Sequence, residues 1–439
     1  MRTRKFREGL GLGVKFAQGE PLTSLQNLVE LRVRWVRDIV LWSVMEPVAG
    51  QFKPFPTEFQ TRLDFYRAND IGIVFLLAFG NLRAYPATPN EPNRFIAPSA
   101  FARYAVEVAK QLKAAGVRFK LEVWNEPHSF VLGPTLGGAW NGKPPSPWLD
   151  HYVWIVAETV RQVKAFDPAI EVIDDDDMWV LHYWFLEAGL PRELDGFAFH
   201  PYVNDSSVGP EMTAVSADTD WTRPFTVVDA DRSFRSAVRR LREQGIAKLG
   251  KTPRLWITEW GWAIGQKTPF GPVTEDMLTG FLPRAFIVAE AAGVEALCWF
   301  SSQDSVDGPM GLVTNDGRKR KSYVAFKTLA EQLGDFALVG QVAGSKHPTS
   351  GVQAYLFRDG DRYRLALWNI EPANRLLILP EVMRGSTAID SVGQPVPVFN
   401  NPNGVSSLLF SSAPVYISGV APGPALDAAL AATELDLRP

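Results

Sequence analysis

The stretch LEVWNEP at residues 121–127 decides the fold of this chain, together with LWITEWG at residues 255–261. Each stretch is a short apolar run, typical of a buried strand, that carries a glutamate at its end: Glu126 in the first and Glu259 in the second. Proline or glycine closes both runs, which indicates that the strands stop there. A carboxylate at the end of a parallel strand points into the mouth of an α/β fold. We therefore expect both glutamates to face one site.

Short apolar runs alternate with amphipathic, helix-period segments along most of the chain. Strand–helix alternation is typical of parallel strands joined by crossovers, and eight such units over this length predict a (β/α)₈ barrel, also called a TIM barrel. A doubly wound open sheet is less favoured, because no glycine-rich phosphate loop follows the first strand. The predicted strands are 11–17, 33–42, 71–79, 119–125, 170–175, 196–201, 254–260 and 295–301.

The pattern changes after residue 333. The runs 352–357 and 363–368 flank Asp359-Gly360-Asp361, a hairpin signal, and further strand-like runs follow without an intervening helix. We expect residues 1–333 to form the barrel, residues 334–420 a small antiparallel β-sandwich, and residues 421–439 a tail that is either a docked helix or disordered.

Composition excludes several classes of protein. A net charge of −3 in 439 residues, with no concentrated positive patch, argues against a nucleic-acid partner. No segment is long and apolar enough to span a bilayer, and no apolar stretch typical of a signal peptide follows the basic N-terminus. The single cysteine, Cys298, lies in an apolar strand and is expected to be a small buried side chain.

Two carboxylates at the ends of two barrel strands are the groups that cleave a glycosidic bond as an acid and a nucleophile. Alone, either is compatible with a helix start or with an ion pair to Arg37, which also ends an apolar strand. His200 and Tyr202 lie two apart on another strand and so share a face. The five histidines show no zinc spacing, so we expect neither a metal nor another cofactor.

These residues resemble the site pattern of clan A glycoside hydrolases. The matching positions are Asn125-Glu126 on the fourth strand, His200 and Tyr202 on the sixth, Glu259 on the seventh and Trp299 on the eighth. Within the clan, the segments 36–50, 195–202 and 311–327 are most similar to family 39 enzymes, with family 5 next.

The resemblance implies a retaining β-glycosidase and a role for each matching residue. Glu126 is then the general acid/base and Glu259 the nucleophile, while Asn125 holds the hydroxyl beside the anomeric carbon. In the same scheme Arg37 and Tyr202 bind Glu259, His200 supports the acid/base or a sugar hydroxyl, and Trp299 forms the floor under the sugar. Trp42 and Trp262 are further expected substrate contacts.

Two places depart from the family pattern. Phe79 stands at the end of the third strand, where some clan members carry a histidine. The acidic run Asp174–Asp177 ends the fifth strand, and is interpreted as a solvated or capping turn. The alternatives are a subsite for a basic amino sugar and a calcium site.

Several questions of function stay open in the sequence. The expected partner is an oligo- or polysaccharide, and the surplus of tryptophans favours endo action on a polymer such as an exopolysaccharide. The alternatives are an exo-acting β-xylosidase or β-glucosidase, a transglycosylase with the same residues, and a non-catalytic carbohydrate-binding relative. Oligomeric state and compartment are not indicated by the sequence.

Overall fold

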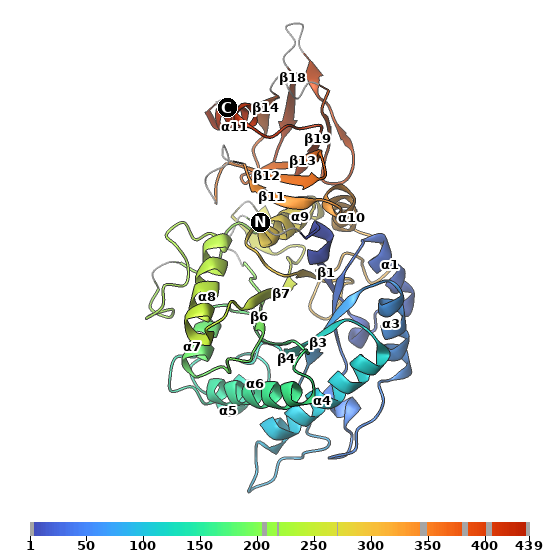
Figure 1. The fold of residues 1–439 in the computed structure, drawn as a ribbon, viewed down its shortest axis with the longest axis vertical. Coiled ribbons are helices and arrows are strands. Elements are labelled where there is room, and N and C mark those ends of the chain that lie inside the picture. Colours follow the sequence, from blue (N-terminus) through green and yellow to red (C-terminus); the bar gives the residue numbers. More distant parts are fainter. Residues whose placement is uncertain are drawn as a thin grey trace.

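The computed structural model describes residues 4–203, 209–216, 219–269, 271–342, 349–379, 385–400 and 406–435. Eight parallel strands close into a barrel in the order β1-β10-β7-β6-β5-β4-β3-β2 (Figure 1). The prediction of a (β/α)₈ barrel is confirmed. Its strands are β1 (Leu10–Gly13), β2 (Trp35–Ile39), β3 (Gly72–Leu77), β4 (Phe119–Val123), β5 (Val172–Asp176), β6 (Gly196–Phe199), β7 (Arg254–Trp260) and β10 (Leu297–Phe300).

Helices lie around the outside of the barrel. In α4, the residues Phe101, Tyr104, Val108 and Leu112 recur at helical spacing and are fully buried against the strands. The helices are α1 (Leu25–Glu30), α2 (Trp42–Met45), α3 (Thr57–Ala68), α4 (Pro98–Ala115), α5 (Leu132–Leu136), α6 (Pro147–Phe166), α7 (Leu181–Glu187), α8 (Phe234–Leu249), α9 (Glu275–Ala291) and α10 (Lys321–Leu333). A two-stranded hairpin, β8 (Lys267–Thr268) and β9 (Gly271–Pro272), lies in the segment after β7.

The lower interior of the barrel is apolar. Trp35 and Trp256 meet edge to face at 5.0 Å between ring centroids, and Cys298 packs in the same cluster with no exposure. The expectation of a buried, inert cysteine is therefore confirmed, and burial raises the pKa of its thiol. Lys120 of β4 is a charged side chain against this apolar cluster, where its ammonium group lies over the rings of Trp35 and Trp256 and pairs with Glu171.

Two antiparallel sheets follow the barrel, as predicted. One has the order β11-β12-β13-β19-β15-β16 and the other β14-β18-β17. In the hairpin of β12 and β13, Gly360 has φ +58°, a conformation that favours glycine. The strands are β11 (Ala337–Gln341), β12 (Val352–Asp359), β13 (Arg362–Asn369), β14 (Arg375–Leu379), β15 (Thr387–Ile389), β16 (Pro395–Val396), β17 (Phe399–Asn400), β18 (Ser406–Phe410) and β19 (Val415–Ser418).

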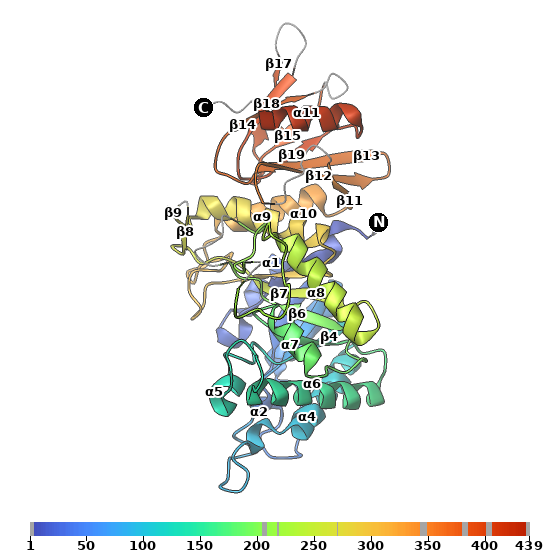
Figure 2. The same cartoon turned by 90° about the vertical axis from the view of Figure 1, so that its left-hand side faces the viewer.

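The last described segment is a helix, α11 (Pro424–Leu435). Leu426 and Leu430 are buried in the core of the sandwich, so the docked-helix alternative for the tail holds over these residues. Figure 2 shows the sandwich stacked on the side of the barrel that carries α9 and α10.

A buried ion pair joins the barrel to the sandwich. The carboxylate of Glu211, in the segment after β6, accepts hydrogen bonds from Arg284 Nε of α9 at 2.8 Å and from Trp368 Nε1 of β13 at 2.9 Å. Arg284 and Glu211 are almost completely buried. Each partner satisfies the other, so this contact ties β13 to a barrel helix and to the segment that follows β6.

No helix in the described part of the chain combines the length and the apolarity needed to cross a membrane.

Candidate active site

The ends of four barrel strands, β2, β4, β6 and β7, bring the predicted polar residues together. Arg37 lies on β2, Glu259 on β7, and Asn125 and Glu126 follow β4 directly. The backbone at the end of β4 is sharply bent, because Trp124 and Glu126 both have positive φ, +73° and +45°. Such conformations are uncommon for bulky residues and concentrate at functional sites. Here the bend turns the Glu126 side chain into the barrel mouth.

Glu259 is held at both carboxylate oxygens. Arg37 Nη1 donates to Oε1, and Tyr202 Oη donates to Oε2 at 2.9 Å. The residue is 9% exposed. Two donors on an otherwise buried carboxylate fix its orientation. Glu259 is therefore held in one position at the mouth of the barrel.

Arg37 is the cation at the centre of the site. Its Nε donates to Glu122 Oε2 at 2.6 Å and its Nη2 donates to Asn125 Oδ1 at 2.8 Å. Burial lowers the pKa of the guanidinium, but the carboxylates of Glu122, Glu259 and Asp175 outweigh burial and raise it above its ordinary value. Arg37 thus stays charged and holds Glu122, Asn125 and Glu259 around its guanidinium.

Glu126 has a different environment from Glu259. Its Oε1 lies 2.8 Å from His200 Nδ1, and its backbone N–H donates to Asp175 Oδ2 at 2.9 Å. Burial raises the pKa of Glu126, and the negative charges of Glu259 and Asp177 raise it further against the opposing hydrogen bond from His200. A carboxyl with a raised pKa keeps its proton and can act as an acid.

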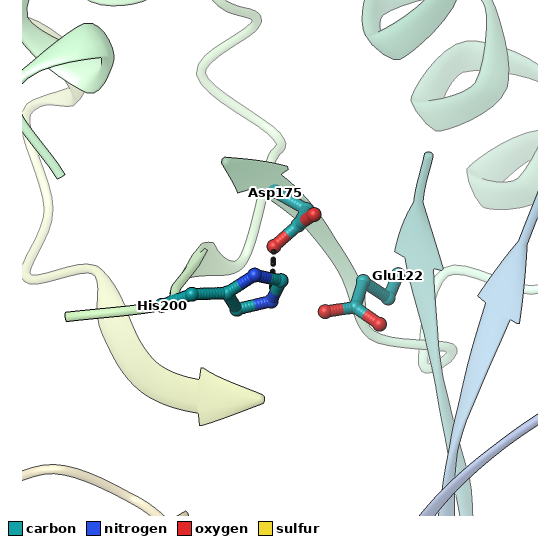
Figure 3. Close-up of side chains that lie close together, drawn as sticks. All are labelled: Glu122, Asp175 and His200. Atoms are coloured by element: carbon teal, nitrogen blue, oxygen red, sulfur yellow. Dashed lines mark ion pairs between the residues drawn. The ribbon is translucent and has the colours of Figure 1, made fainter. Parts of the chain in front are cut away.

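His200 lies behind Glu126 and is 1% exposed. Its Nε2 lies 3.0 Å from Thr258 Oγ1 and 3.2 Å from Asp175 Oδ1. Figure 3 shows Asp175 above the imidazole and Glu122 beside it, each from its own strand. Burial lowers the pKa of His200, yet the charges of Asp175 and Glu259 raise it well above its ordinary value.

A cavity of about 400 Å³ opens over these groups. Of the predicted site residues, the cavity is lined by Arg37, Asn125, Glu126, Tyr202 and Glu259. Within the Glu126, His200 and Glu259 set, one oxygen of each glutamate lies within 4.8 Å of the other. That separation suits a direct attack by one carboxylate while the other protonates the leaving oxygen, for which the groups lie ~5–5.5 Å apart.

The three tryptophans predicted to contact a sugar do not line this cavity. Trp299 is 1% exposed and stacks on Trp262 at 5.8 Å, and Trp262 packs against Phe281 of α9. Trp42 is fully buried; its Nε1 donates to Glu46 Oε2 at 2.6 Å. The structure therefore does not support these three contacts: Trp42 lies in α2 and Trp262 follows β7, while Trp299 is on a strand, whose successive side chains point to opposite faces. On β10 it is the residue after Trp299, Phe300, that faces the cavity.

The acidic run at the end of β5 is also not a solvated turn. Asp174, Asp175 and Asp176 are all fully buried. Asp174 faces His182 of α7, with 3.4 Å between Oδ1 and Nε2, whereas Asp175 points to His200 and Asp176 to His128. The run therefore supplies partners for three histidines, and only Asp175 reaches the catalytic groups directly.

Most residues that line the cavity were not predicted as site residues; the charged and aromatic ones include Lys15, Phe79, Phe130, Phe300 and Asp307. Lys15 Nζ donates to Asp307 at 2.8 Å and lies 3.5 Å from the centroid of the Phe300 ring. Phe130 is the most open of the three phenylalanines, at 46% exposure. The only sequence signal for any of them was Phe79, noted as a departure from the family.

Among the described residues, three groups have ligand atoms spaced for a metal ion. Two are parts of the catalytic cluster, and the third combines His128 with Asp176 and Asp177. His128 Nδ1 lies 3.0 Å from Asp176 and 3.2 Å from Asp177, so an ion pair already accounts for the third group. Because Ca²⁺ takes oxygen ligands, a set that contains an imidazole does not support the calcium alternative.

Comparisons with known proteins agree with this architecture. No protein-family model matches the sequence, and no curated protein matches it either. Among solved structures, a family 39 glycoside hydrolase from the gut symbiont Bacteroides cellulosilyticus WH2 aligns with a TM-score of 0.73 at 18% identity. The alignment covers 94% of this chain and 81% of that one.

Two further structures resemble the chain over nearly its whole length. A glucosidase from Croceicoccus marinus has a TM-score of 0.60 at 14% identity and covers 95% of this chain and 97% of its own. A GH51 arabinofuranosidase from Xanthomonas axonopodis pv. citri has a TM-score of 0.54 at 15% identity, covering 94% and 96%. The fold is that of clan A glycoside hydrolases, which confirms the predicted resemblance at the level of the fold.

Proposed function

We propose that the protein is a retaining β-glycoside hydrolase that acts by double displacement. The observation that carries the proposal is the contrast between two glutamates whose oxygens lie within 4.8 Å. Glu259 receives two hydrogen bonds, whereas Glu126 has a raised pKa. Neighbouring carboxyls driven to opposite protonation states are the pair that retaining hydrolysis needs.

The first step joins Glu259 to the sugar. Its carboxylate attacks the anomeric carbon while Glu126 gives its proton to the departing glycosidic oxygen. Asn125 Oδ1 is occupied by Arg37, so the amide nitrogen of Asn125 is available to donate to the hydroxyl beside the anomeric carbon.

The second step frees the sugar. Glu126, now a carboxylate, removes a proton from water, and the resulting hydroxide oxygen displaces Glu259 from the anomeric carbon. Two inversions give net retention of configuration. Arg37 and Tyr202 again receive the free carboxylate of Glu259, which returns the site to its starting charge.

Variants of the two glutamates test the proposal. Aryl β-xylosides, β-glucosides and α-arabinofuranosides make a first substrate panel, because the similar structures include xylanases, a glucosidase and an arabinofuranosidase. Glu259→Ala should abolish turnover, and azide should restore it by forming a glycosyl azide of inverted configuration. Glu126→Ala should slow poor leaving groups far more than activated aryl groups, and azide should there give the retained product.

Other outcomes would contradict the assignment. Appreciable hydrolysis by Glu259→Ala without azide removes its role as nucleophile. Equal losses on activated and natural linkages remove the acid role of Glu126. Product configuration, followed by proton NMR during the first turnovers, separates retention from inversion directly.

We further propose endo action on an extended saccharide. Trp140, in the long segment after β4, is 57% exposed and lies 5.4 Å from Trp221, in the segment after β6. Segments that follow barrel strands rise on the same face as the active site, and exposed aromatic rings stack on sugar faces. Trp140→Ala should lower turnover of a polysaccharide and leave a small aryl glycoside unchanged.

Product sizing decides between the remaining alternatives. An endo enzyme gives a ladder of oligosaccharides early in the reaction, whereas an exo-acting β-xylosidase or β-glucosidase releases single sugars. Products longer than the substrate, formed at high substrate concentration, would identify a transglycosylase that uses the same residues.

A further inference from the structure

Asp175 is linked to the proposed acid/base residue, Glu126, in two ways: directly, and through His200. One oxygen, Oδ2, accepts the backbone N–H of Glu126 at 2.9 Å. The other, Oδ1, lies 3.2 Å from His200 Nε2, and the opposite nitrogen of that ring lies 2.8 Å from Glu126 Oε1. Asp175 is fully buried on β5 and does not line the substrate cavity, so it can act on the reaction only through its neighbours.

The charges around His200 determine the direction of its hydrogen bond to Glu126. Asp175 on β5 and Glu122 on β4 lie beside the ring (Figure 3). Glu126 after β4 and Glu259 on β7 face its other nitrogen, Nδ1. The charges of Asp175 and Glu259 outweigh burial and keep the imidazole positively charged. A charged imidazole donates from both nitrogens, so Nδ1–H donates to Glu126 Oε1.

We propose that Asp175 is a positioning residue for Glu126: through His200 it keeps Oε1 as a hydrogen-bond acceptor and thereby places the acidic proton on Oε2. The inference rests on the proposed function, since it needs Glu126 to be the acid. A carboxyl group carries its proton on one oxygen. When His200 donates to Oε1, the proton resides on Oε2, where no other described residue makes a hydrogen bond.

The chemistry follows from this arrangement. During the first step the Oε2 proton moves to the leaving oxygen, and the negative charge left on Glu126 is stabilised by the His200 donor already in place. Asp175 itself gains and loses no proton. Asp175 Oδ2 lies 3.9 Å from Arg37 Nη2, which is longer than a hydrogen bond. The main effect of Asp175 is therefore on Glu126 and not on Glu259.

Asp175→Asn tests the proposal because it removes the charge and preserves the shape. We expect kcat/KM for a glycoside with a poor alkyl leaving group to fall by about tenfold or more, with the roughly 10²–10⁴-fold contribution of general acid catalysis as the upper limit. The 2,4-dinitrophenyl glycoside of the same sugar, which leaves without a proton, should lose less than about threefold. The ratio of the two rates does not depend on how much of the preparation is folded.

A second measurement is independent of turnover. In the ¹⁵N spectrum of the histidine rings, His200 should titrate at least about one pH unit lower in Asp175→Asn than in the wild type, since an anionic partner is lost. Asp175→Ser, which keeps a hydroxyl group, serves if the asparagine variant does not fold. This measurement separates the inference from the proposed function, because it remains valid if no glycoside is hydrolysed.

The neighbouring aspartate provides a matched control. Asp174 is equally buried on the same strand but faces His182 on the outer side. Asp174→Asn should leave both the leaving-group ratio and the His200 titration unchanged. Equal losses on the two substrates in Asp175→Asn, or an unchanged His200 titration, would overturn the proposal.

Discussion

Tyr202 donates its phenolic hydrogen to Glu259 Oε2 at 2.9 Å, on the side of the carboxylate that Arg37 does not occupy. Tyr202 lines the cavity, and its ring meets Phe300 edge to face. The phenol and the guanidinium therefore each hold one carboxylate oxygen of Glu259, the proposed nucleophile.

Tyr202→Phe should lower kcat/KM without unfolding the protein. A hydrogen bond to a charged group contributes about 1.5–3 kcal/mol, which corresponds to a loss of about 10- to 150-fold. Tyr183→Phe is the control, because the Tyr183 hydroxyl is buried on α7 with no hydrogen-bond partner in the described structure. Comparable losses in the two variants would contradict the assignment to Tyr202.

The pH dependence of kcat/KM should show a basic limb set by Glu126. Burial, supported by the charge of Glu259, raises the pKa of Glu126, so its protonated, active form persists to higher pH than in a free glutamate. Activity is then lost as the pH rises through that raised pKa. Glu126→Gln should abolish the limb in the residual activity on dinitrophenyl glycosides.

Removing the Glu259 charge should move the same titration in a known direction. The negative charge of Glu259 raises the pKa of Glu126, so Glu259→Gln should lower it. Burial is the larger cause and persists in the variant, so the pKa should stay above the ordinary glutamate value. Carbon-13 NMR of the Glu126 carboxyl measures the shift, and an upward movement would refute this account of the coupling.

Truncation of Phe130 should change KM, whereas truncation of Trp299 should change stability. Phe130 is 46% exposed in the cavity wall, so Phe130→Ala should raise KM and leave the melting temperature nearly unchanged. Trp299 is buried in the stack with Trp262, and Trp299→Ala should cost about 3–5 kcal/mol of stability. Thermal unfolding and steady-state kinetics on both variants check the pair; a stable Trp299→Ala with raised KM would restore the sugar floor predicted from the sequence.

The contact between Glu211 and Arg284 should control stability. Glu211→Gln leaves the Arg284 charge buried with a neutral partner, and breaking such a pair costs about 3–5 kcal/mol. Chemical denaturation measures the loss. Glu158→Gln, which breaks the exposed pair with Arg161 on α6, should leave the unfolding midpoint unchanged.

The barrel and the centre of the site could be predicted because the signals are local. Each strand is a short apolar run, and polar residues such as Glu126 and Glu259 stand at its end, where a parallel barrel must bring them together. The contact of Arg37 with Glu259 followed from the same reasoning, since a guanidinium at a strand end meets carboxylates that other strands bring to the same mouth.

The aromatic wall could not be predicted in the same way. Whether Trp299 or Phe300 faces the cavity depends on the phase of the last strand, and a shift of one residue exchanges the two faces. The acidic run was misjudged for a related reason: the partners of Asp174 and Asp175 are histidines 8 and 25 positions later in the chain, which only the closed barrel brings close.

Arg37 reaches from β2 to residues at the ends of β4 and β7, strands that are not its neighbours in the barrel wall. The hydrogen bonds of Arg37 to Glu122, Asn125 and Glu259 form only when every strand between them has paired in the correct register. Catalytic turnover is consequently a direct report of ring closure. In a library of core variants, an active clone would certify that its barrel has assembled, without any separate measurement of structure.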